Sequence, residues 1–340
     1  MKIAIVGAGL IGRKRGLQLE GHELVGLFDI DSARARTLAA ELHTRAFDSE
    51  RDLLQHSAAE IVIVATNNAN LAAVTGRAIE AKKHVLVEKP AGISLAQVER
   101  LSELAAAHGV AVKVGFNHRF HPALLETRRR IDEGQLGPLS FMRVRYGHGG
   151  RLGYESEWRA QPEQSGGGEL IDQGVHILDL IHWFFGPLPL RASFVTTSFW
   201  NMPVDDNAVL TVADAGPAAP GHGAPPPRWA TFHVSCSEWK NTFSLELYGR
   251  TGKVLVSGLG GSYGVETLTY YRMLPQMGPP EIEQREFTGP DRSWALDLQN
   301  LVSHLSSGTP LWGDLKSARY ALEVVRDAYR QSGYQLPSSE

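Results

Sequence analysis

The chain begins Met1-Lys2 and then reads Ile3-Ala4-Ile5-Val6-Gly7-Ala8-Gly9-Leu10-Ile11-Gly12, a short apolar run that leads directly into the pattern G-x-G-x-x-G. Glycine at these three positions allows a tight turn, a close approach of the backbone to a pyrophosphate, and close packing of the next helix on the strand. Free N–H groups at the start of that helix favour an anion. The stretch predicts a dinucleotide-binding turn formed by Gly7, Gly9, Leu10, Ile11 and Gly12, with a purely structural turn as the alternative.

The residue that ends the second apolar run bears on which dinucleotide is bound. Asp29 follows the glycine pattern at about the spacing expected for an acidic ribose ligand, roughly 20 residues. A carboxylate in that place accepts hydrogen bonds from a ribose diol and repels a 2′-phosphate, so Asp29 favours NAD unless it is only a solvated strand-end carboxylate. Arg34 and Arg36 could meet a 2′-phosphate, and they keep NADP as the alternative cofactor.

Four more short runs rich in Val and Ile lie within the first 120 residues, at 24–28, 61–65, 84–87 and 110–114. Continuous apolarity is typical of parallel strands that are covered on both faces. Helical patterns separate these runs, and the clearest begins with the capping box of Ser94 and Gln97 and ends at Gly109. This alternation predicts an α/β fold, with a Rossmann-type doubly wound parallel sheet over residues 1–120.

The pattern changes after residue 120. Apolar and polar positions alternate at 139–146, 231–237 and 242–248, which is typical of half-buried strands in antiparallel pairs. Residues 216–227 contain five prolines and three glycines and are expected to form a loop. The chain is therefore predicted to continue as an α+β substrate-binding and oligomerisation domain over residues 121–340, with a large, mostly antiparallel sheet and helices at 122–133, 168–185, 294–306 and 315–330.

The composition excludes several classes of protein. Apolar residues make up 43% of the 340 residues, charged residues 21%, and the formal net charge is −3. These values are ordinary for a chain with a sizeable core, and the near-neutral charge argues against nucleic acid or an anionic membrane as a partner. Cys236 is the only cysteine, which rules out an intramolecular disulfide and favours a reducing, cytoplasmic location. No apolar run approaches the roughly 20 residues that span a bilayer, and the apolar start is too short for a signal peptide.

A lysine follows the fourth of the short apolar runs, in Glu88-Lys89-Pro90. The carboxyl ends of strands in open α/β sheets are where ligands bind. Pro90 restricts Lys89 to an extended conformation and so fixes the direction of its side chain. A lysine beside a nicotinamide cation loses its proton more easily, and it could then exchange a proton with a hydroxyl or carbonyl group. The alternative interpretation is an ordinary surface lysine.

A second candidate lies on the helix expected at 168–185, which is apolar around nearly its whole circumference and is therefore expected to be buried. Asp172, His176 and Asp179 share one face of it. Asp172 could orient His176 as a general base. The alternatives are a core histidine beside a structural aspartate, a helix cap made by Glu169, and a metal site of all four residues. One histidine with three carboxylates is no recognised zinc spacing, and we expect no metal.

Together these features resemble the glucose–fructose oxidoreductase, inositol dehydrogenase and rhizopine-catabolism family, Gfo/Idh/MocA. The resemblance implies a nicotinamide-dependent oxidoreductase acting on sugars, inositols or nucleotide sugars, with Lys89, Asp172 and His176 lining the hydride-transfer site. It also implies cofactor contacts from Thr66, Asn67, Glu88, Lys89, Asn117, Trp158 and Arg159, and a homodimer or homotetramer formed through the open face of the second sheet. The motifs that carry it are residues 7–12, Ala65-Thr66-Asn67, Glu88-Lys89-Pro90, Gly115-Phe116-Asn117-His118-Arg119-Phe120, Glu157-Trp158-Arg159 and residues 167–179.

Some features depart from the family pattern or lie outside it. The usual Thr-Pro-x-x-x-His is replaced by Thr66-Asn67-Asn68-Ala69-Asn70, and Arg13-Lys14-Arg15 lacks the common histidine. The glycines at 258–264 have no physical explanation from the sequence. Arg143, Arg145, His148 and Arg151 could hold a phosphate on the substrate, although a solvated strand face is the favoured interpretation. The rival functions are a non-catalytic cofactor- or sugar-sensing regulator and an NAD-dependent glycoside hydrolase.

Overall fold

The computed structural model describes residues 1–214, 227–276 and 278–336. The chain forms two compact units, each assembled from separate segments. Unit 1 contains Met1–Asn117, Glu163–Gly166 and Trp294–Leu322. Unit 2 contains His118–Pro162, Gly167–Ser293 and Glu323–Glu340. The first break lies close to the expected boundary at residue 120, but the return of Trp294–Leu322 to unit 1 was not anticipated.

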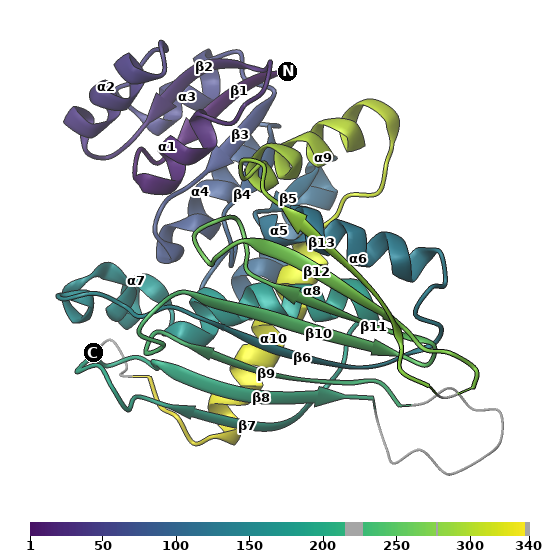
Figure 1. The fold of residues 1–340 in the computed structure, drawn as a ribbon. Coiled ribbons are helices and arrows are strands. Elements are labelled where there is room, and N and C mark those ends of the chain that lie inside the picture. The colour runs from purple at the N-terminus through teal and green to yellow at the C-terminus, as the bar shows by residue number, and fades with distance from the viewer. Residues whose placement is uncertain (215–226, 277, 337–340) are drawn as a thin grey trace. The chain divides into compact units, whose positions relative to one another are not determined.

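Unit 1 is built on a five-stranded parallel sheet in the order β2-β1-β3-β4-β5 (Figure 1). Every residue of β3 is buried, as expected for a strand in a sheet that is covered on both faces. In this strand order the direction of winding reverses between β1 and β3, and ligands of such sheets bind beside that point. The strands are β1 Lys2–Val6, β2 Glu23–Phe28, β3 Ile61–Val64, β4 His84–Val87 and β5 Val112–Val114.

The helices of unit 1 begin and end where the local sequence indicates. The Ser94 side chain accepts a hydrogen bond from the Gln97 N–H at the start of α5, and Gly109 ends that helix with φ +65°. A helix from late in the chain also belongs to this core: Leu298 and Leu301 of α9 pack with Ile3 and Ile5 of the sheet. The helices are α1 Leu10–Gly16, α2 Ser32–Glu41, α3 Glu50–His56, α4 Asn68–Glu80, α5 Leu95–His108 and α9 Ser293–Ser307.

Unit 2 contains an eight-stranded sheet in the order β13-β12-β11-β10-β6-β9-β8-β7 (Figure 1). Its neighbouring strands are antiparallel except for β6 and β9, which run parallel. This confirms the expected large, mostly antiparallel sheet. The strands are β6 Leu139–Gly147, β7 Leu190–Thr196, β8 Asn207–Ala213, β9 Trp229–Ser235, β10 Thr242–Gly249, β11 Gly252–Ser257, β12 Glu266–Arg272 and β13 Glu281–Phe287.

Helices pack on one face of this sheet. Buried and more exposed residues alternate along its central strands, so one face forms the core with α6, Pro122–Asp132, and α8, Val175–Phe185. The continuous helix expected at 168–185 is in fact two elements, the π-helix η4, Leu170–Gly174, followed by α8. The last helix, α10, spans Leu315–Gln331.

Two further expectations from the sequence concern a loop and membrane-spanning helices. The proline-rich loop predicted at 216–227 lies almost entirely outside the described residues. Within the part of the chain that the structure describes, none of the helices has both the length and the apolar character needed to cross a bilayer.

Candidate active site

The three glycines after β1 serve two different purposes. A Cβ atom at Gly7 would lie 2.3 Å from the Ala65 oxygen, and one at Gly12 would lie 1.9 Å from the Gly7 oxygen, so side chains are excluded there by packing. A Cβ atom at Gly9 would meet nothing within 4 Å. The backbone at Gly9 is therefore open to close approach from outside, as a dinucleotide pyrophosphate requires. The glycine cradle fits that ligand.

Asp29 lies directly beside this loop. Its Oδ2 accepts a hydrogen bond from the Ala8 N–H at 2.7 Å, and its Oδ1 accepts one from the Asp31 N–H at 2.9 Å. The Arg34 guanidinium lies 4.0 Å from Oδ1, with its side chain more than half exposed. Asp29 thus holds the glycine loop through a hydrogen bond and places its carboxylate beside the loop. The nearby Arg34 guanidinium is the group that could pair with a 2′-phosphate.

Other predicted cofactor residues follow the neighbouring strands of unit 1. Thr66, after β3, donates its hydroxyl to the Asn67 carbonyl at 3.1 Å. The Asn67 amide donates to Gln164 Oε1 at 3.1 Å. Asn117, after β5, is buried at the start of η1, Asn117–Phe120. The strand ends therefore place these residues at one edge of the sheet, where the topology predicts a ligand.

Glu88 and Lys89 follow β4 but differ in environment. Glu88 is buried, and its Oε1 accepts a hydrogen bond from Arg15 Nε at 2.7 Å. Lys89 is only partly buried. Glu88 therefore forms an ion pair within unit 1. Of the two residues, Lys89 is the more accessible to a ligand.

In unit 2, the start of the helix that carries Asp172 and His176 is held by an aspartate from another segment. Asp205 accepts hydrogen bonds from the Gly168 N–H at 2.9 Å, the Leu170 N–H at 2.8 Å and the Tyr329 hydroxyl at 2.6 Å. A Cβ atom at Gly168 would lie 1.9 Å from the backbone carbonyl oxygen of Asp205, so the close approach of the two segments requires glycine here. The Glu169 side chain makes no cap hydrogen bond, so the alternative of a Glu169 cap is wrong.

Asp172 is paired with an arginine that had been predicted near the cofactor. Arg159 Nε lies 3.3 Å from Asp172 Oδ2, and its guanidinium covers the neighbouring Trp158 ring at 4.6 Å. Burial lowers the pKa of Arg159, but Asp172, Tyr154 and Glu157 together outweigh this effect and raise the pKa overall. Trp158 and Arg159 thus belong to unit 2, together with the candidate carboxylate Asp172.

His176 is buried in α8 and stacks on a second imidazole. The His118 and His176 ring centroids are 3.8 Å apart with an interplanar angle of 18°. The Nε2 atom of His118 lies 3.1 Å from the Tyr146 hydroxyl. Asp179, the third polar residue on this helix face, accepts two hydrogen bonds from Arg119, at 2.7 and 2.5 Å. His176 can therefore exchange a proton within a polar, well-packed setting, while Asp179 serves the packing of the helix.

Glu169 and His148 form a further buried pair that the sequence did not single out as a pair. His148 Nε2 lies 3.5 Å from Glu169 Oε2, and the Gly150 N–H donates to His148 Nδ1 at 3.1 Å. Because Nδ1 accepts that bond, the ring proton lies on Nε2 and points at Glu169. Burial raises the pKa of Glu169, and Glu169 in turn raises the pKa of His148 despite the burial of the imidazole.

The glycines at 258–264 now have an explanation. Gly258, Gly260, Gly261 and Gly264 all have φ between +54° and +95°, so the connection between β11 and β12 is a tight turn that side chains would strain. Tyr263 lies in this turn, 5.2 Å from the Tyr146 ring between centroids. Burial raises the pKa of Tyr263 to about 12, so it acts as a neutral phenol. In the sequence, this residue could have been found only as the single tyrosine within a run that contains four glycines.

The basic residues proposed as a phosphate grip each have a carboxylate partner. Arg143 pairs with Glu246, Arg145 with Glu238, and Arg151 with Glu157. His148 pairs with Glu169. Their charges are offset within the protein, and Arg143 and Arg145 lie on exposed strand positions, which agrees with the interpretation of a solvated strand face.

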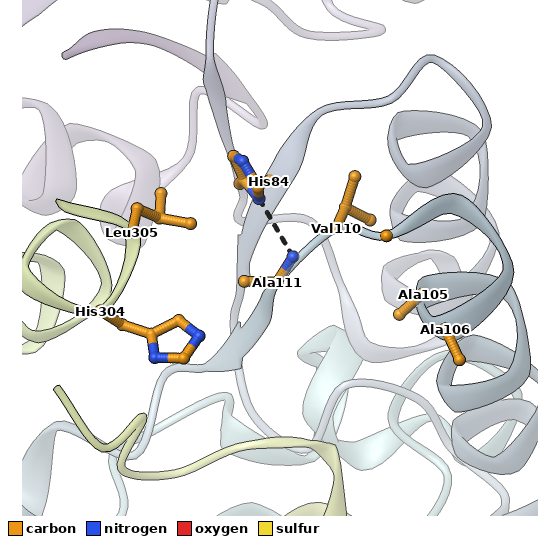
Figure 2. A pocket seen from close by; sticks show the side chains of 8 residues that line it. His84, Ala105, Ala106, Val110, Ala111, His304 and Leu305 are labelled. Carbon is orange, nitrogen blue, oxygen red and sulfur yellow. Dashed lines mark hydrogen bonds between the residues drawn. The ribbon is translucent and has the colours of Figure 1, made fainter. Parts of the chain in front are cut away.

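A depression of about 460 Å³ lies elsewhere in unit 1 (Figure 2). It is lined by His84 at the start of β4, Ala111, the end of α5 and His304 and Leu305 of α9. The His84 Nδ1 atom accepts a hydrogen bond from the Ala111 N–H at 3.0 Å. His84 begins β4 and Lys89 follows its end, so this depression lies at the edge of the sheet opposite to the ligand edge and forms no part of the candidate site.

Family models match both parts of the chain. Residues 1–116 match the model described as an oxidoreductase family with an NAD-binding Rossmann fold. Residues 124–255 match the GFO/IDH/MocA C-terminal domain.

Curated relatives resemble this chain over part of its length. Glucose-6-phosphate 3-dehydrogenase of Bacillus subtilis (strain 168) is 29% identical over 202 residues, which is 58% of this chain and 56% of the relative. An inositol 2-dehydrogenase of Acidothermus cellulolyticus (strain ATCC 43068 / DSM 8971 / 11B) is 31% identical over 193 residues, 54% of this chain and 53% of the relative. The chain thus aligns with only a little over half the length of these relatives.

Solved structures resemble nearly the whole chain. Levoglucosan dehydrogenase in complex with NADH and levoglucosan gives a TM-score of 0.85 at 15% identity, covering 98% of this chain and 97% of that chain. UDP-N-acetylglucosamine 3-dehydrogenase from Acidithiobacillus ferrooxidans gives 0.79 at 18% identity, covering 98% of each. At such identities the similarity establishes the shared fold.

Proposed function

The chain belongs to the Gfo/Idh/MocA oxidoreductase family, and from that premise we propose that it is an NAD-dependent dehydrogenase, with NADP as the alternative cofactor. The proposed reaction transfers a hydride between NAD(P) and a secondary hydroxyl or ketone of a sugar, an inositol or a nucleotide sugar. The names of its relatives support this substrate class, since they include dehydrogenases of glucose 6-phosphate and of inositol.

The observation that carries the proposal is the setting of His176. It is a buried imidazole on an apolar helix, one helical turn from Asp172, and it stacks on His118. A buried imidazole needs either a structural partner or a chemical task. Asp172, four residues before His176, is partly buried and pairs with Arg159, while Asp179 pairs with Arg119. We propose that the nearby Asp172 carboxylate also favours the protonated form of His176 in its role as general base.

The cofactor role falls to unit 1. The open backbone at Gly9, flanked by Leu10 and Ile11, would receive the pyrophosphate, and Asp29 would accept hydrogen bonds from a ribose diol. Bound NAD supplies the carbon that accepts the hydride. Thr66, Asn67 and Asn117 are further proposed contacts, and Trp158 and Arg159 stay proposed contacts on the strength of their sequence motif.

In the oxidative direction, His176 would take the proton of the substrate hydroxyl, and Asp172 would favour the imidazolium that forms. Bound NAD(P) would supply the acceptor for the hydride. Lys89 is proposed as a second group that handles the reacting proton, from its place at the carboxyl end of β4. Positioning and proton transfer by these side chains would supply the protein's share of the acceleration.

The test is steady-state turnover of Lys89→Ala and His176→Ala, with NAD binding measured separately by calorimetry. We expect each change to lower turnover by about 10²-fold or more while NAD still binds, because each removes a group that moves or holds the reacting proton. His56→Ala, an exposed histidine of α3, is the matched control and should keep normal turnover. Near-normal turnover in both site variants would refute the assignment.

The assay also separates the rival functions. The probes are myo-inositol, glucose 6-phosphate, levoglucosan and UDP-N-acetylglucosamine, each with NAD and with NADP. A dehydrogenase forms net reduced cofactor with its substrate, whereas a sensing regulator forms none. A glycoside hydrolase that uses NAD transiently releases the aglycone without net reduction.

We further propose a homodimer or homotetramer and a cytoplasmic location. The open sheet face supports the first, because Phe141 stacks between Trp229 and Tyr248 there and Phe194 is 66% exposed. Light scattering coupled to gel filtration tests it, and a monomer at micromolar concentration would refute it. The single cysteine supports the location.

A further inference from the structure

Four charged side chains meet in the interior of unit 1, and we call them the Arg15 network. Arg15 pairs with Glu88 at 2.7 Å and with Asp297 at 2.8 Å, and Lys113 pairs with the second oxygen of Asp297 at 3.1 Å. The side chains of Arg15, Lys113 and Asp297 are no more than 1% exposed, and that of Glu88 is 9% exposed. Two positive and two negative charges are thus buried together in balance.

The network joins segments that the sequence presents as separate motifs. Arg15 stands three residues after Gly12 on the short helix α1, and Glu88 immediately precedes Lys89. Gly115 makes room for the pair, since a Cβ atom there would lie 2.7 Å from Arg15 Nη2 and 2.9 Å from Glu88 Oε2. The glycine loop, the Glu88-Lys89-Pro90 motif and the start of the Gly115 motif are therefore tied together at one point.

Asp297 brings a fourth segment to this point from the far end of the chain. It lies on α9, whose Leu298 and Leu301 pack in the core of unit 1. The Arg15 guanidinium also donates to the Trp294 carbonyl at 3.3 Å and lies over the Trp294 ring at 4.6 Å. Asp297 and Trp294 of α9 thus contact the Nη1 atom of the Arg15 guanidinium, while Glu88 at the end of β4 contacts its Nε atom.

A buried ion network is a poor way to gain stability, because desolvation offsets much of the attraction between the charges. What the network does provide is a fixed orientation, since the planar Arg15 guanidinium contacts Glu88 through Nε and Asp297 through Nη1 and so holds both in one geometry. Helix α1 rises only about 1.5 Å per residue, so a shift at Arg15 acts within about 5 Å on the glycine loop. The same shift acts on Glu88 and hence on the neighbouring Lys89.

We propose that Arg15 and Asp297 are positioning residues for the proposed oxidoreductase site, setting the geometry of the glycine loop for the dinucleotide and the direction of Lys89. The proposal rests on the proposed function. It assigns to Asp297 of α9 an indirect part in cofactor binding, through its ion pair with Arg15.

The first experiment measures NAD binding by calorimetry to the full-length chain carrying Asp297→Asn. We expect the dissociation constant to rise at least about tenfold, because Arg15 loses the anion that orients it and misplacement of about 1 Å already has large effects on a site. Leu301→Ala on the same helix is the matched control. It lowers the melting temperature through a core cavity but should leave the dissociation constant of the folded protein within about twofold.

A second variant separates positioning from stability. Asp297→Asn leaves one excess positive charge, and adding Lys113→Met restores the balance, so the double variant should recover much of the lost melting temperature. NAD binding should stay weak, because Arg15 still lacks its anchor. Recovery of affinity together with stability would overturn the proposal, and so would unchanged affinity in Asp297→Asn alone. If the wild-type chain binds neither NAD nor NADP, the proposed function fails, and the positioning role fails with it.

Discussion

Each unit holds a cluster of charged side chains, which is buried in unit 1 and partly exposed in unit 2. The Arg15 network of unit 1 joins an arginine and a lysine to two carboxylates and is charge-balanced. In unit 2, what we call the Glu169 cluster consists of Glu169, His148, Asp172 and Arg159, and it combines an imidazole with two carboxylates and one arginine.

The difference is one of protonation. Burial lowers the pKa of Arg15, but Glu88 and Asp297 more than reverse this, so the guanidinium stays charged at any physiological pH. Burial raises the pKa of the Glu88 carboxyl in the first cluster and of the Glu169 carboxyl in the second, and Glu169 raises the pKa of His148. The second cluster differs from the first in holding an imidazole beside its carboxylates, which suits a site of chemistry, whereas two cations hold the geometry of the first.

The largest effect expected from this comparison is on stability. Arg15→Met leaves Glu88 and Asp297 buried near each other with one positive charge fewer, and it should lower the free energy of unfolding by about 3–5 kcal/mol. Arg159→Met should cost about 1 kcal/mol or less, because its side chain is 29% exposed and water screens the pair. Urea denaturation of both variants measures the difference. Equal losses in the free energy of unfolding would contradict the expected difference between the buried Arg15 pairs and the partly exposed Arg159 pair.

An intermediate effect is expected at the residue that frames the Glu169 cluster. Asp205→Ala leaves the Gly168 and Leu170 N–H groups and the Tyr329 hydroxyl without their acceptor. The expected loss is about 1–3 kcal/mol, which calorimetric melting should show. Asp214→Ala, which removes a more exposed carboxylate that pairs with Arg228, is the control and should cost less. A larger loss in the control would argue against Asp205 as the anchor of this helix.

The smallest effect is a pH dependence confined to the second cluster. Because the pKa values of Glu169 and His148 are raised in the folded state, the folded protein binds more protons than the unfolded one above the ordinary values of 4.5 and 6.5. Stability should therefore fall as the pH rises from about 5 to about 8. Glu169→Gln removes one titrating group and the partner that raises the pKa of the other, so its melting temperature should fall less steeply over this range.

The control for this pH dependence is Glu246→Gln. Lys253 and Arg143 lower the pKa of Glu246 despite partial burial, so its titration lies below the ordinary value of 4.5 and outside the tested range. Its melting temperature should follow the wild-type slope. A Glu169→Gln slope equal to that of the wild type would contradict the assignment of a shared proton to the Glu169–His148 pair.

Much of the fold could be predicted because it depends on neighbours in the sequence. The strand β4 was expected at 84–87 and begins and ends there, and Ser94 caps α5 as its spacing to Gln97 indicates. The parallel sheet and the mostly antiparallel sheet follow from the two hydrophobic periodicities. The break of the helix at 168–185 into η4 and α8 was missed, because nothing in the apolar pattern of that segment marks a π-helix.

The residues of the candidate site also divide into those that the local sequence indicates and those that it does not. Gly9, Asp29 and Lys89 could be selected from local motifs, because the function expected of each follows from the strand that it ends or the turn that it forms. His118, Tyr263 and Arg15 were not selected, and Glu169 was considered only as a helix cap or a metal ligand. Their places depend on partners in other segments: His118 stacks on His176, Glu169 pairs with His148, and Arg15 pairs with Asp297. The roles of the selected residues stay predictions until the variants are measured.

The sequence by itself determined the strand–turn–helix at Gly7 and the two sheet types, since local periodicity and backbone restrictions act over a few residues. Only the tertiary structure decided that α9 belongs to unit 1 and brings Asp297 to Arg15, and that Asp205 rather than Glu169 holds the helix of Asp172 and His176. The physical reason is that a buried charge or N–H group must find a partner, and the chain can supply that partner from any distance along the sequence.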